Sequence, residues 1–166
     1  MIKTNRLILK SLCEDDKRVM MNLFKSLEIK KTYMIPDYED ENGYEKLFDK
    51  FLNLSHMNNH FVRGIYLKDE LIGFINEVEI VNKIIELGYV IDPKYKNNGY
   101  ASESLINSIN YLFSLGFEEI KAGAFKENDA SIKVMKKCGM MKIDSTELIE
   151  YRGILHECKY FSKRRI

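Results

Sequence analysis

The stretch ELGYVIDPKYKNNGYASESL, residues 86–105, decides the fold, because a strand pattern gives way to a helix pattern within it. Residues 87–91 are mostly apolar, Pro93 follows the strand, and apolar residues recur at helical spacing from Ala101 onward. The first N–H groups of a helix have no acceptor inside the helix, and Gly99 has no side chain to obstruct a ligand. This loop is therefore predicted to hold a phosphate or pyrophosphate, assisted by the helix dipole.

Two interpretations of the loop stay open on this pattern alone. Gly99 either admits a ligand or serves only as a turn residue, while Lys94 and Lys96 add positive charge that favours an anion. The loop is not a Walker loop, because G-x-x-x-x-G-K-[ST] is absent. Its single glycine also differs from the dinucleotide-binding fingerprint.

The segments on either side of the loop predict one α/β domain over residues 1–166. Before the loop, strands are expected at 6–10, 61–67, 71–81 and 83–91, and helices from 14 and over 42–59. After it, we expect a helix to Gly116, a strand over 119–125, a helix from Asn128 or Asp129 to Gly139, and strands over 140–151 and 154–162. Strand–helix–strand alternation indicates a parallel pair. The expected architecture is a mixed sheet of six or seven strands with about four flanking helices.

The composition excludes several classes of protein. The chain has 166 residues, and its 26 Lys and Arg against 25 Asp and Glu give a net charge of +1, so the basic excess of a nucleic-acid-binding protein is missing. No apolar run approaches the roughly 20 residues of a membrane span. The three cysteines lack Cys-x-x-Cys spacing and fit no metal-ligand pattern with the three histidines. We therefore expect free thiols, no metal and a cytoplasmic location.

Four segments in register resemble the GNAT N-acetyltransferases. Lys96-x-x-Gly99-x-Ala101 resembles the acyl-coenzyme-A loop [RQ]-x-x-G-x-[GA] of that family, and TNRLIL at 4–9 resembles its opening T-x-R-L-x-L strand. ELGY at 86–89 with GYASE at 99–103 resembles E-I-G-Y…G-Y-A-T-E, and NDAS at 128–131 with CGM at 138–140 resembles N-x-x-S…L-G-F. The resemblance covers nearly the whole chain and is closest to the ribosomal-protein-alanine N-acetyltransferase (RimJ/RimL) type.

This resemblance implies a binding site for acetyl-CoA, used as a co-substrate without a metal. The adjacent parallel strands, here 83–91 and 119–125, would splay apart and hold the pantetheine arm between them. The Asn128 amide would also bind this arm, whereas Lys133, Lys136 and Lys137 either approach the adenosine phosphate or form a solvated helix face. The remaining cofactor contacts would be the backbone of Tyr89, Val90 and Ile91 for pantetheine, and the N–H groups of Lys96, Asn97, Asn98, Gly99, Tyr100 and Ala101 for pyrophosphate.

The resemblance also implies direct attack of an amine on the thioester in a ternary complex. Many members protonate the leaving thiolate with a tyrosine seven residues after the asparagine, but that position is Met135 here, which cannot donate a proton. The RimL-like pattern offers Ser131 as the donor and Glu150 as the base, with Glu86 as an alternative base. Each has a structural alternative, since Ser131 can serve only the first helical turn and the glutamates can be ordinary strand residues.

The acceptor is predicted only as a class. Residues 33–50 carry a local acidic excess, and the resemblance places this segment beside the acceptor groove, where it would attract a cationic amine. The tyrosines of this segment either line the groove or pack beneath it. A protein N-terminus, a polyamine, an amino acid or an antibiotic amine all fit, and a non-catalytic coenzyme-A-binding module is the alternative function. The closing hairpin offers an edge for a homodimer.

Overall fold

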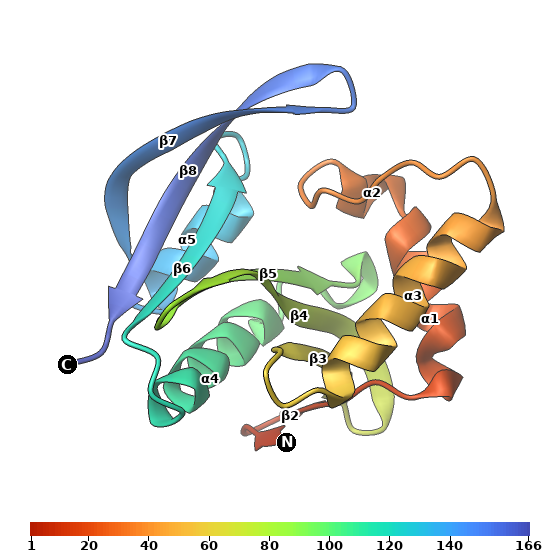
Figure 1. Ribbon diagram of the computed structural model, residues 1–166, viewed down its shortest axis with the longest axis horizontal. Helices are drawn as coiled ribbons and strands as arrows, with labels where there is room; N and C mark the ends of the chain where they lie inside the picture. Colours follow the sequence, from red (N-terminus) through yellow and green to blue (C-terminus); the bar gives the residue numbers. More distant parts are fainter.

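The computed structural model describes residues 1–166 as one twisted sheet of eight strands with helices on both faces (Figure 1). The strand order across the sheet is β1-β2-β3-β4-β5-β6-β8-β7. The strands are β1 (Ile2–Lys3), β2 (Leu7–Lys10), β3 (Val62–Leu67), β4 (Glu70–Val81), β5 (Ile84–Ile91), β6 (Glu119–Phe125), β7 (Met141–Tyr151) and β8 (Ile154–Arg164). The helices are α1 (Lys17–Lys25), α2 (Leu27–Lys30), α3 (Glu41–His56), α4 (Tyr100–Ser114) and α5 (Asp129–Lys137), with 3₁₀ turns at Glu14–Asp16 and Pro93–Tyr95.

Two hydrophobic clusters, one on each face of the sheet, hold these layers together. Because successive side chains of a strand point to opposite faces, β3 sends Ile65 into the cluster under α4 and α5 and Tyr66 into the cluster under α1 and α3. In β5, Leu87 faces α4 and α5, whereas Val90 faces α1 and α3. This alternation assigns every β5 side chain to one face, which matters for the site.

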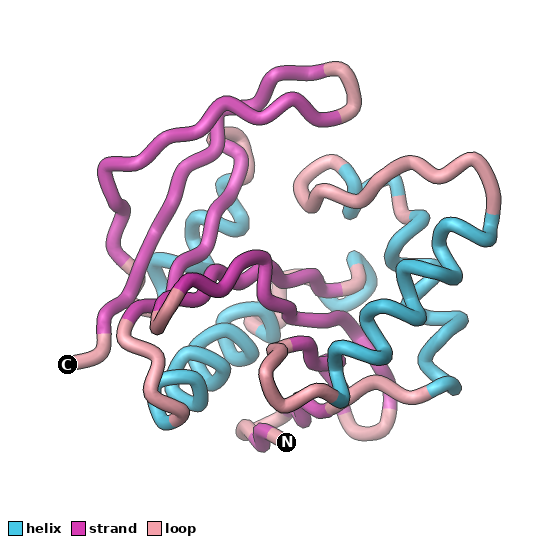
Figure 2. Tube along the Cα trace, viewed as in Figure 1, coloured by secondary structure: helices cyan, strands magenta, loops and turns pink.

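The parallel pair in the middle of the sheet separates soon after it begins. β5 and β6 pair only where Ile84, Ile85 and Glu86 face Glu119, Ile120 and Lys121. Beyond that point β5 stays paired with β4, and β6 stays paired with β8, so both outer ladders continue while the central one stops. The two halves of the sheet therefore diverge into a V, which is visible as the separation of β5 from β6 in Figure 2.

The predicted fold class is confirmed, and the numbers of elements differ slightly. The sheet has eight strands rather than six or seven, because Ile2–Lys3 pairs with residues 8 and 9 as a two-residue strand too short to give a sequence pattern. The single-turn helix Leu27–Lys30 is a further addition and makes five α-helices. Asn128 rather than Asp129 is the N-cap of α5, since its side chain accepts the Ser131 N–H.

Three further observations concern the sequence predictions. No helix is long and apolar enough to cross a bilayer. No group of three or more His, Cys, Asp and Glu side chains is placed to hold a metal ion. All three cysteines are free thiols, and burial raises the pKa of Cys138 to about 11.

Candidate active site

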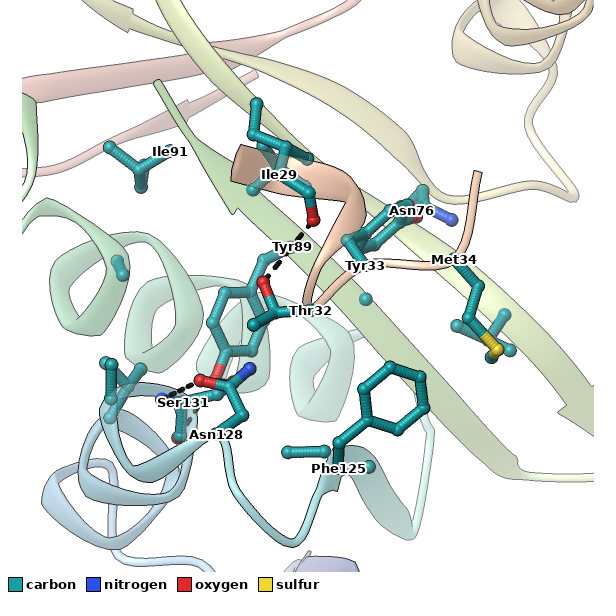
Figure 3. Close-up of a pocket in the computed structure, with 18 of the residues that line it drawn as sticks. Ile29, Thr32, Tyr33, Met34, Asn76, Tyr89, Ile91, Phe125, Asn128 and Ser131 are labelled. Carbon is teal, nitrogen blue, oxygen red and sulfur yellow. Dashed lines mark hydrogen bonds between the residues drawn. The ribbon is translucent and has the colours of Figure 1, made fainter. Parts of the chain in front are cut away.

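A cavity of about 830 Å³ fills the V between β5 and β6. Its walls come from the diverging halves of both strands, the loop before α4, the first turn of α5, and the segment around α2. Figure 3 shows side chains from several of these elements converging on the same space. One continuous cavity therefore joins the central gap in the sheet to the loop that precedes α4.

The loop before α4 presents a run of unpaired backbone donors. Asn97 has a φ of 62° and Gly99 a φ of 79°, and these left-handed residues turn the chain into the helix. The N–H groups of residues 97–102 have no acceptor within the protein, whereas the first helical bond that closes over the loop runs from Glu103 N–H to Gly99 O at 3.0 Å. Consecutive free N–H groups at a helix start attract an anion.

All of the predicted loop residues except Asn98 line the cavity, and one of the predicted backbone donors is already bonded. Lys96, Asn97, Gly99, Tyr100 and Ala101 line it. The Lys96 N–H is already bonded to Pro93 O at 3.3 Å, so it is less available than predicted. The Asn98 side chain turns away and donates to the carbonyls of residues 95 and 96 at 3.1 and 2.9 Å, so Asn98 stabilises the loop from within.

Contacts between Arg6 and Glu103, called the Arg6 clamp below, stabilise the loop on the side away from the cavity, and they were not predicted from the sequence. The Glu103 carboxylate accepts the Arg6 N–H at 2.8 Å and the Thr4 hydroxyl at 2.5 Å, and pairs with the Arg6 guanidinium at 2.7 Å. Burial opposes ionisation of Glu103, but these hydrogen bonds outweigh it and hold its pKa below the ordinary value. The Arg6 guanidinium also lies 4.6 Å from the Tyr100 ring centroid. Two motifs quoted separately in the sequence thus meet at one contact.

The β5 wall offers backbone groups to an extended ligand. The Val90 carbonyl points toward Gly73 of β4, and the Asp92 N–H donates to Ile72 O at 2.8 Å. Because backbone groups alternate along a strand, those of Tyr89 and Ile91 point the other way, toward the gap beyond the last β6 partner. This free edge has the geometry needed to bind an amide-containing chain as an added strand.

Two polar side chains at the start of α5, those of Asn128 and Ser131, face this wall and its Tyr89 side chain (Figure 3). Asn128 Oδ1 accepts the Ser131 N–H at 3.1 Å, which leaves the Asn128 NH₂ group free to donate into the cavity. The Tyr89 hydroxyl lies 2.7 Å from Ser131 Oγ and 3.2 Å from Ser131 O. Met135, two turns from the N-cap, is fully buried in the core and does not line the cavity.

The two predicted bases lie in different surroundings. Glu86 lines the cavity, and burial, followed by the nearby charges of Glu79 and Glu147, raises the pKa of its carboxyl group. Glu150 is exposed on β7 and is not part of the cavity wall, although its neighbour Ile149 is. The geometry therefore brings Glu86 to the cavity with Ser131 and Asn128, and leaves Glu150 outside.

The acidic segment at 33–50 does not form the acceptor rim as expected. None of its carboxylates lines the cavity, and three of them form ion pairs: Asp37 with Lys30 and Arg152, Glu41 with Lys25, and Glu45 with Lys17. Tyr33 lines the cavity and donates to Asn76 Oδ1 at 2.6 Å. Tyr38 and Tyr44 instead pack on each other, with their ring centroids 5.0 Å apart. The apolar residues 34–36 form this wall.

The β7–β8 hairpin closes over this wall from the other half of the sheet (Figure 1). The Tyr151 hydroxyl lies 3.3 Å from Tyr33 O, 3.2 Å from Ile35 O and 3.3 Å from Ile35 N. Arg152 Nε donates to Asp37 at 2.9 Å. These contacts join the two sides of the V above the cavity and limit the width of its mouth.

Comparisons with known proteins place this geometry in context. A family model described as "Acetyltransferase (GNAT) domain" matches residues 6–141. An uncharacterized N-acetyltransferase of Bacillus subtilis, YoaA, is 31% identical over 146 residues, which cover 85% of this chain and 82% of that protein.

Two solved structures have the same fold. Spermidine N-acetyltransferase from Vibrio cholerae, in complex with CoA and spermine, has a TM-score of 0.81 at 22% identity, covering 96% of this chain and 95% of that one. An acetyltransferase from Salmonella typhimurium that modifies the N-terminal serine of ribosomal protein L7/L12 has a TM-score of 0.83 at 16% identity, covering 98% and 97%.

Proposed function

The chain belongs to the GNAT acetyltransferase family and is an acyl-CoA-dependent N-acyltransferase, and on this premise we propose that it transfers an acetyl group from acetyl-CoA to a primary amine by direct attack in a ternary complex. One observation carries the proposal: a single cavity joins the free N–H groups at 97–102 to the gap between β5 and β6. An anionic head and an extended amide-bearing arm are the two parts of coenzyme A that these features suit.

In this arrangement the coenzyme lies along β5. Its pyrophosphate accepts hydrogen bonds from the backbone at 97–102, and its pantetheine arm pairs with the free backbone groups of Tyr89 and Ile91. The Asn128 NH₂ group, which has no partner within the protein, binds a pantetheine carbonyl in this proposal. The thioester then lies in the gap between β5 and β6, which is open to both faces of the sheet.

The alternation of β5 side chains separates the acceptor from the leaving group. Glu86 lies on the face covered by α1 and α3, whereas Tyr89 contacts Ser131 of α5 on the opposite face. An amine that attacks from the Glu86 side expels the thiolate toward the α5 side. Nucleophile and leaving group thus occupy opposite sides of the carbonyl carbon without competing for space.

Glu86 is the base that this geometry favours. Burial and the nearby carboxylates raise its pKa, which makes it a better proton acceptor than an exposed glutamate. The bound ammonium first gives one proton to solvent, because only the neutral amine has a lone pair. That lone pair forms the C–N bond, and the carbonyl electron pair moves to oxygen. As the intermediate collapses, the C–S pair leaves with sulfur and the nitrogen proton passes to Glu86. A backbone N–H near Ile91 is the proposed donor to the oxyanion.

Glu150 stays a prediction as the base. Its exposed place on β7 requires a movement of the hairpin, or a water chain, to serve the reaction. Substituting each glutamate by glutamine separates the two assignments, since only the true base shapes the acid limb of the pH–rate profile.

The acceptor is proposed to be a primary amine on a small molecule or a peptide. The carboxylate of Glu86 in the cavity lining favours a group that arrives as an ammonium ion. Residues 34–36 and Ile149 suit an apolar portion beside that amine. A polyamine and a protein N-terminal residue, the substrates named for two structural relatives, are the first candidates.

The test is to mix the protein with acetyl-CoA and a panel of polyamines, amino acids, antibiotic amines and N-terminal peptides, and to follow release of free thiol. We expect acetyl-CoA to bind and at least one amine to accelerate thiol release. Binding without turnover on any acceptor across several pH values would instead indicate a non-catalytic coenzyme-A-binding module. Absence of binding would refute both functions.

A further inference from the structure

The buried methionine at position 135 leaves the leaving group without the expected hydroxyl donor. Met135 is fully buried against the core and reaches no cavity surface. The cavity nevertheless contains a different pair of hydroxyls on the same side of the V, contributed by β5 and the first turn of α5. Tyr89 and Ser131 are the residues that carry them.

The two hydroxyls are held by an unusual set of contacts. The Tyr89 side chain crosses from β5 to α5 and ends beside Ser131, as Figure 3 shows. The tyrosine proton has two acceptors on one residue, Ser131 Oγ at 2.7 Å and Ser131 O at 3.2 Å. Asn128 fixes the backbone of the same serine at 3.1 Å. Ser131 is thus anchored at three atoms, and its hydroxyl hydrogen is the part that stays free to turn.

This geometry decides where the serine proton points. When Tyr89 donates to Ser131 O, the serine hydroxyl is able to donate back to the tyrosine oxygen. When Tyr89 donates instead to Ser131 Oγ, the serine proton must point elsewhere, and the cavity is the direction left open. An anion arriving in the cavity favours the second arrangement, because hydrogen bonds to charged groups are the stronger ones.

The family resemblance already implies that Ser131 donates a hydrogen bond to the departing coenzyme A thiolate, and we propose that Tyr89 positions the serine hydroxyl for this contact. This inference rests on the function proposed above. The C–S bond breaks with its electron pair on sulfur, the oxyanion pair restores the carbonyl, and the nitrogen proton goes to the base. The thiolate is stabilised as an anion and takes its final proton from solvent or the protonated base. Ser131 touches the leaving group, and Tyr89 acts through it.

The electrostatics of Tyr89 fit a positioning role better than that of an acid. Burial raises the pKa of its hydroxyl, so the residue keeps its proton over the working pH range. A thiol has an ordinary pKa of about 8.5, so a buried tyrosine would protonate its thiolate only uphill. A hydrogen bond relayed through serine needs no such transfer. The pair therefore stabilises negative charge on sulfur without losing a proton.

The chain of hydrogen bonds from Tyr89 through Ser131 to the sulfur, called the relay below, is tested by the thiol pKa of bound coenzyme A. This measurement does not require the amine substrate to be known. The protein is saturated with coenzyme A, and thiolate absorbance is followed against pH, with the dethio-coenzyme A complex as blank. A hydrogen bond to the thiolate lowers the thiol pKa, and we expect Ser131→Ala to raise it by about one pH unit, a tenfold change in acid dissociation constant. Tyr89→Phe should give a smaller rise in the same direction. Ser131→Thr, which keeps a hydroxyl, should retain most of the effect.

Controls separate this inference from the proposed function. Tyr111→Phe on α4 removes a tyrosine hydroxyl outside the cavity and should leave the thiol pKa unchanged. Tyr89→Leu replaces Tyr89→Phe if the latter fails to fold. Failure of the wild-type protein to bind coenzyme A would contradict the proposed function. If coenzyme A binds normally but its thiol pKa is the same in the wild type, Ser131→Ala and Tyr89→Phe, the hydrogen-bond relay is wrong while the proposed function stands. A change of the thiol pKa in Ser131→Ala with none in Tyr89→Phe would also contradict the relay.

Discussion

Gly99→Val tests whether the loop before α4 binds the pyrophosphate through its conformation. Gly99 has a φ of 79°, in the left-handed region that β-branched residues almost never adopt. A Cβ at this position would meet only Arg6 Nη2 at 3.5 Å, which is ordinary contact distance. The substitution should therefore act by twisting the backbone, rather than by a collision with neighbouring atoms.

The magnitude follows from two contributions. Holding a non-glycine residue in the left-handed region costs about 1–2 kcal/mol, and a β-branched residue belongs at the upper end. If the loop relaxes instead, N–H groups within 97–102 turn away from the phosphates, and each hydrogen bond to a charged group is worth about 1.5–3 kcal/mol. Loss of one such bond weakens coenzyme binding roughly 10- to 150-fold.

Calorimetric titration with coenzyme A and with pantetheine measures this effect. Pantetheine lacks the pyrophosphate, so Gly99→Val should weaken coenzyme A strongly and leave pantetheine nearly unchanged. Gly99→Asn is the matched control, because asparagine tolerates the left-handed region and should retain more affinity. Unchanged coenzyme A affinity in a folded Gly99→Val protein would refute the loop assignment, and an equal loss for both ligands would refute the conformational reasoning.

Three further predictions concern other parts of the molecule. Glu86→Gln should lower turnover by roughly 100-fold or more and remove the acid limb of the pH–rate profile. In the wild type this limb should lie above the ordinary glutamate range, because the pKa of Glu86 is raised. The same loss in Glu150→Gln, with normal activity in Glu86→Gln, would reverse the assignment. Glu103→Gln should destabilise the protein to urea above the ordinary glutamate pKa, and the deficit should vanish as pH falls through the lowered pKa of the folded state; a deficit constant with pH would contradict the Arg6 clamp. Met135→Tyr should cost about 1–3 kcal/mol of stability through overpacking without raising turnover, since position 135 is buried; higher turnover would show that the hydroxyl reaches the cavity.

The elements of the fold were predictable where a pattern repeats over several residues. The strand–helix change at 86–105 and the helix over 42–59 correspond to β5, α4 and α3. Ile2–Lys3 and Leu27–Lys30 were not predicted, because elements this short are fixed by tertiary pairing and capping rather than by their own periodicity. The splay of the central pair was expected only from the resemblance, since nothing in the spacing of apolar residues shows where a ladder stops.

The candidate site divides in the same way. Backbone functions at 96–101 depend on local conformation, and Gly99 signals that conformation directly. Contacts between distant segments left no local signal: the clamp of Arg6 on Glu103, and the Tyr89 hydroxyl on Ser131. The acidic segment at 33–50 misled because composition counts charges without their partners, and those partners come from elsewhere in the fold.

The most direct test of the central claim is a crystal structure of the protein with coenzyme A bound. The account predicts the pyrophosphate within hydrogen-bonding distance of the N–H groups at 97–102, and the pantetheine arm in the gap between β5 and β6 beside Tyr89 and Ile91. The sulfur should lie within hydrogen-bonding reach of Ser131. Coenzyme A bound elsewhere, or a cavity between β5 and β6 that stays free of ligand at saturation, would contradict it.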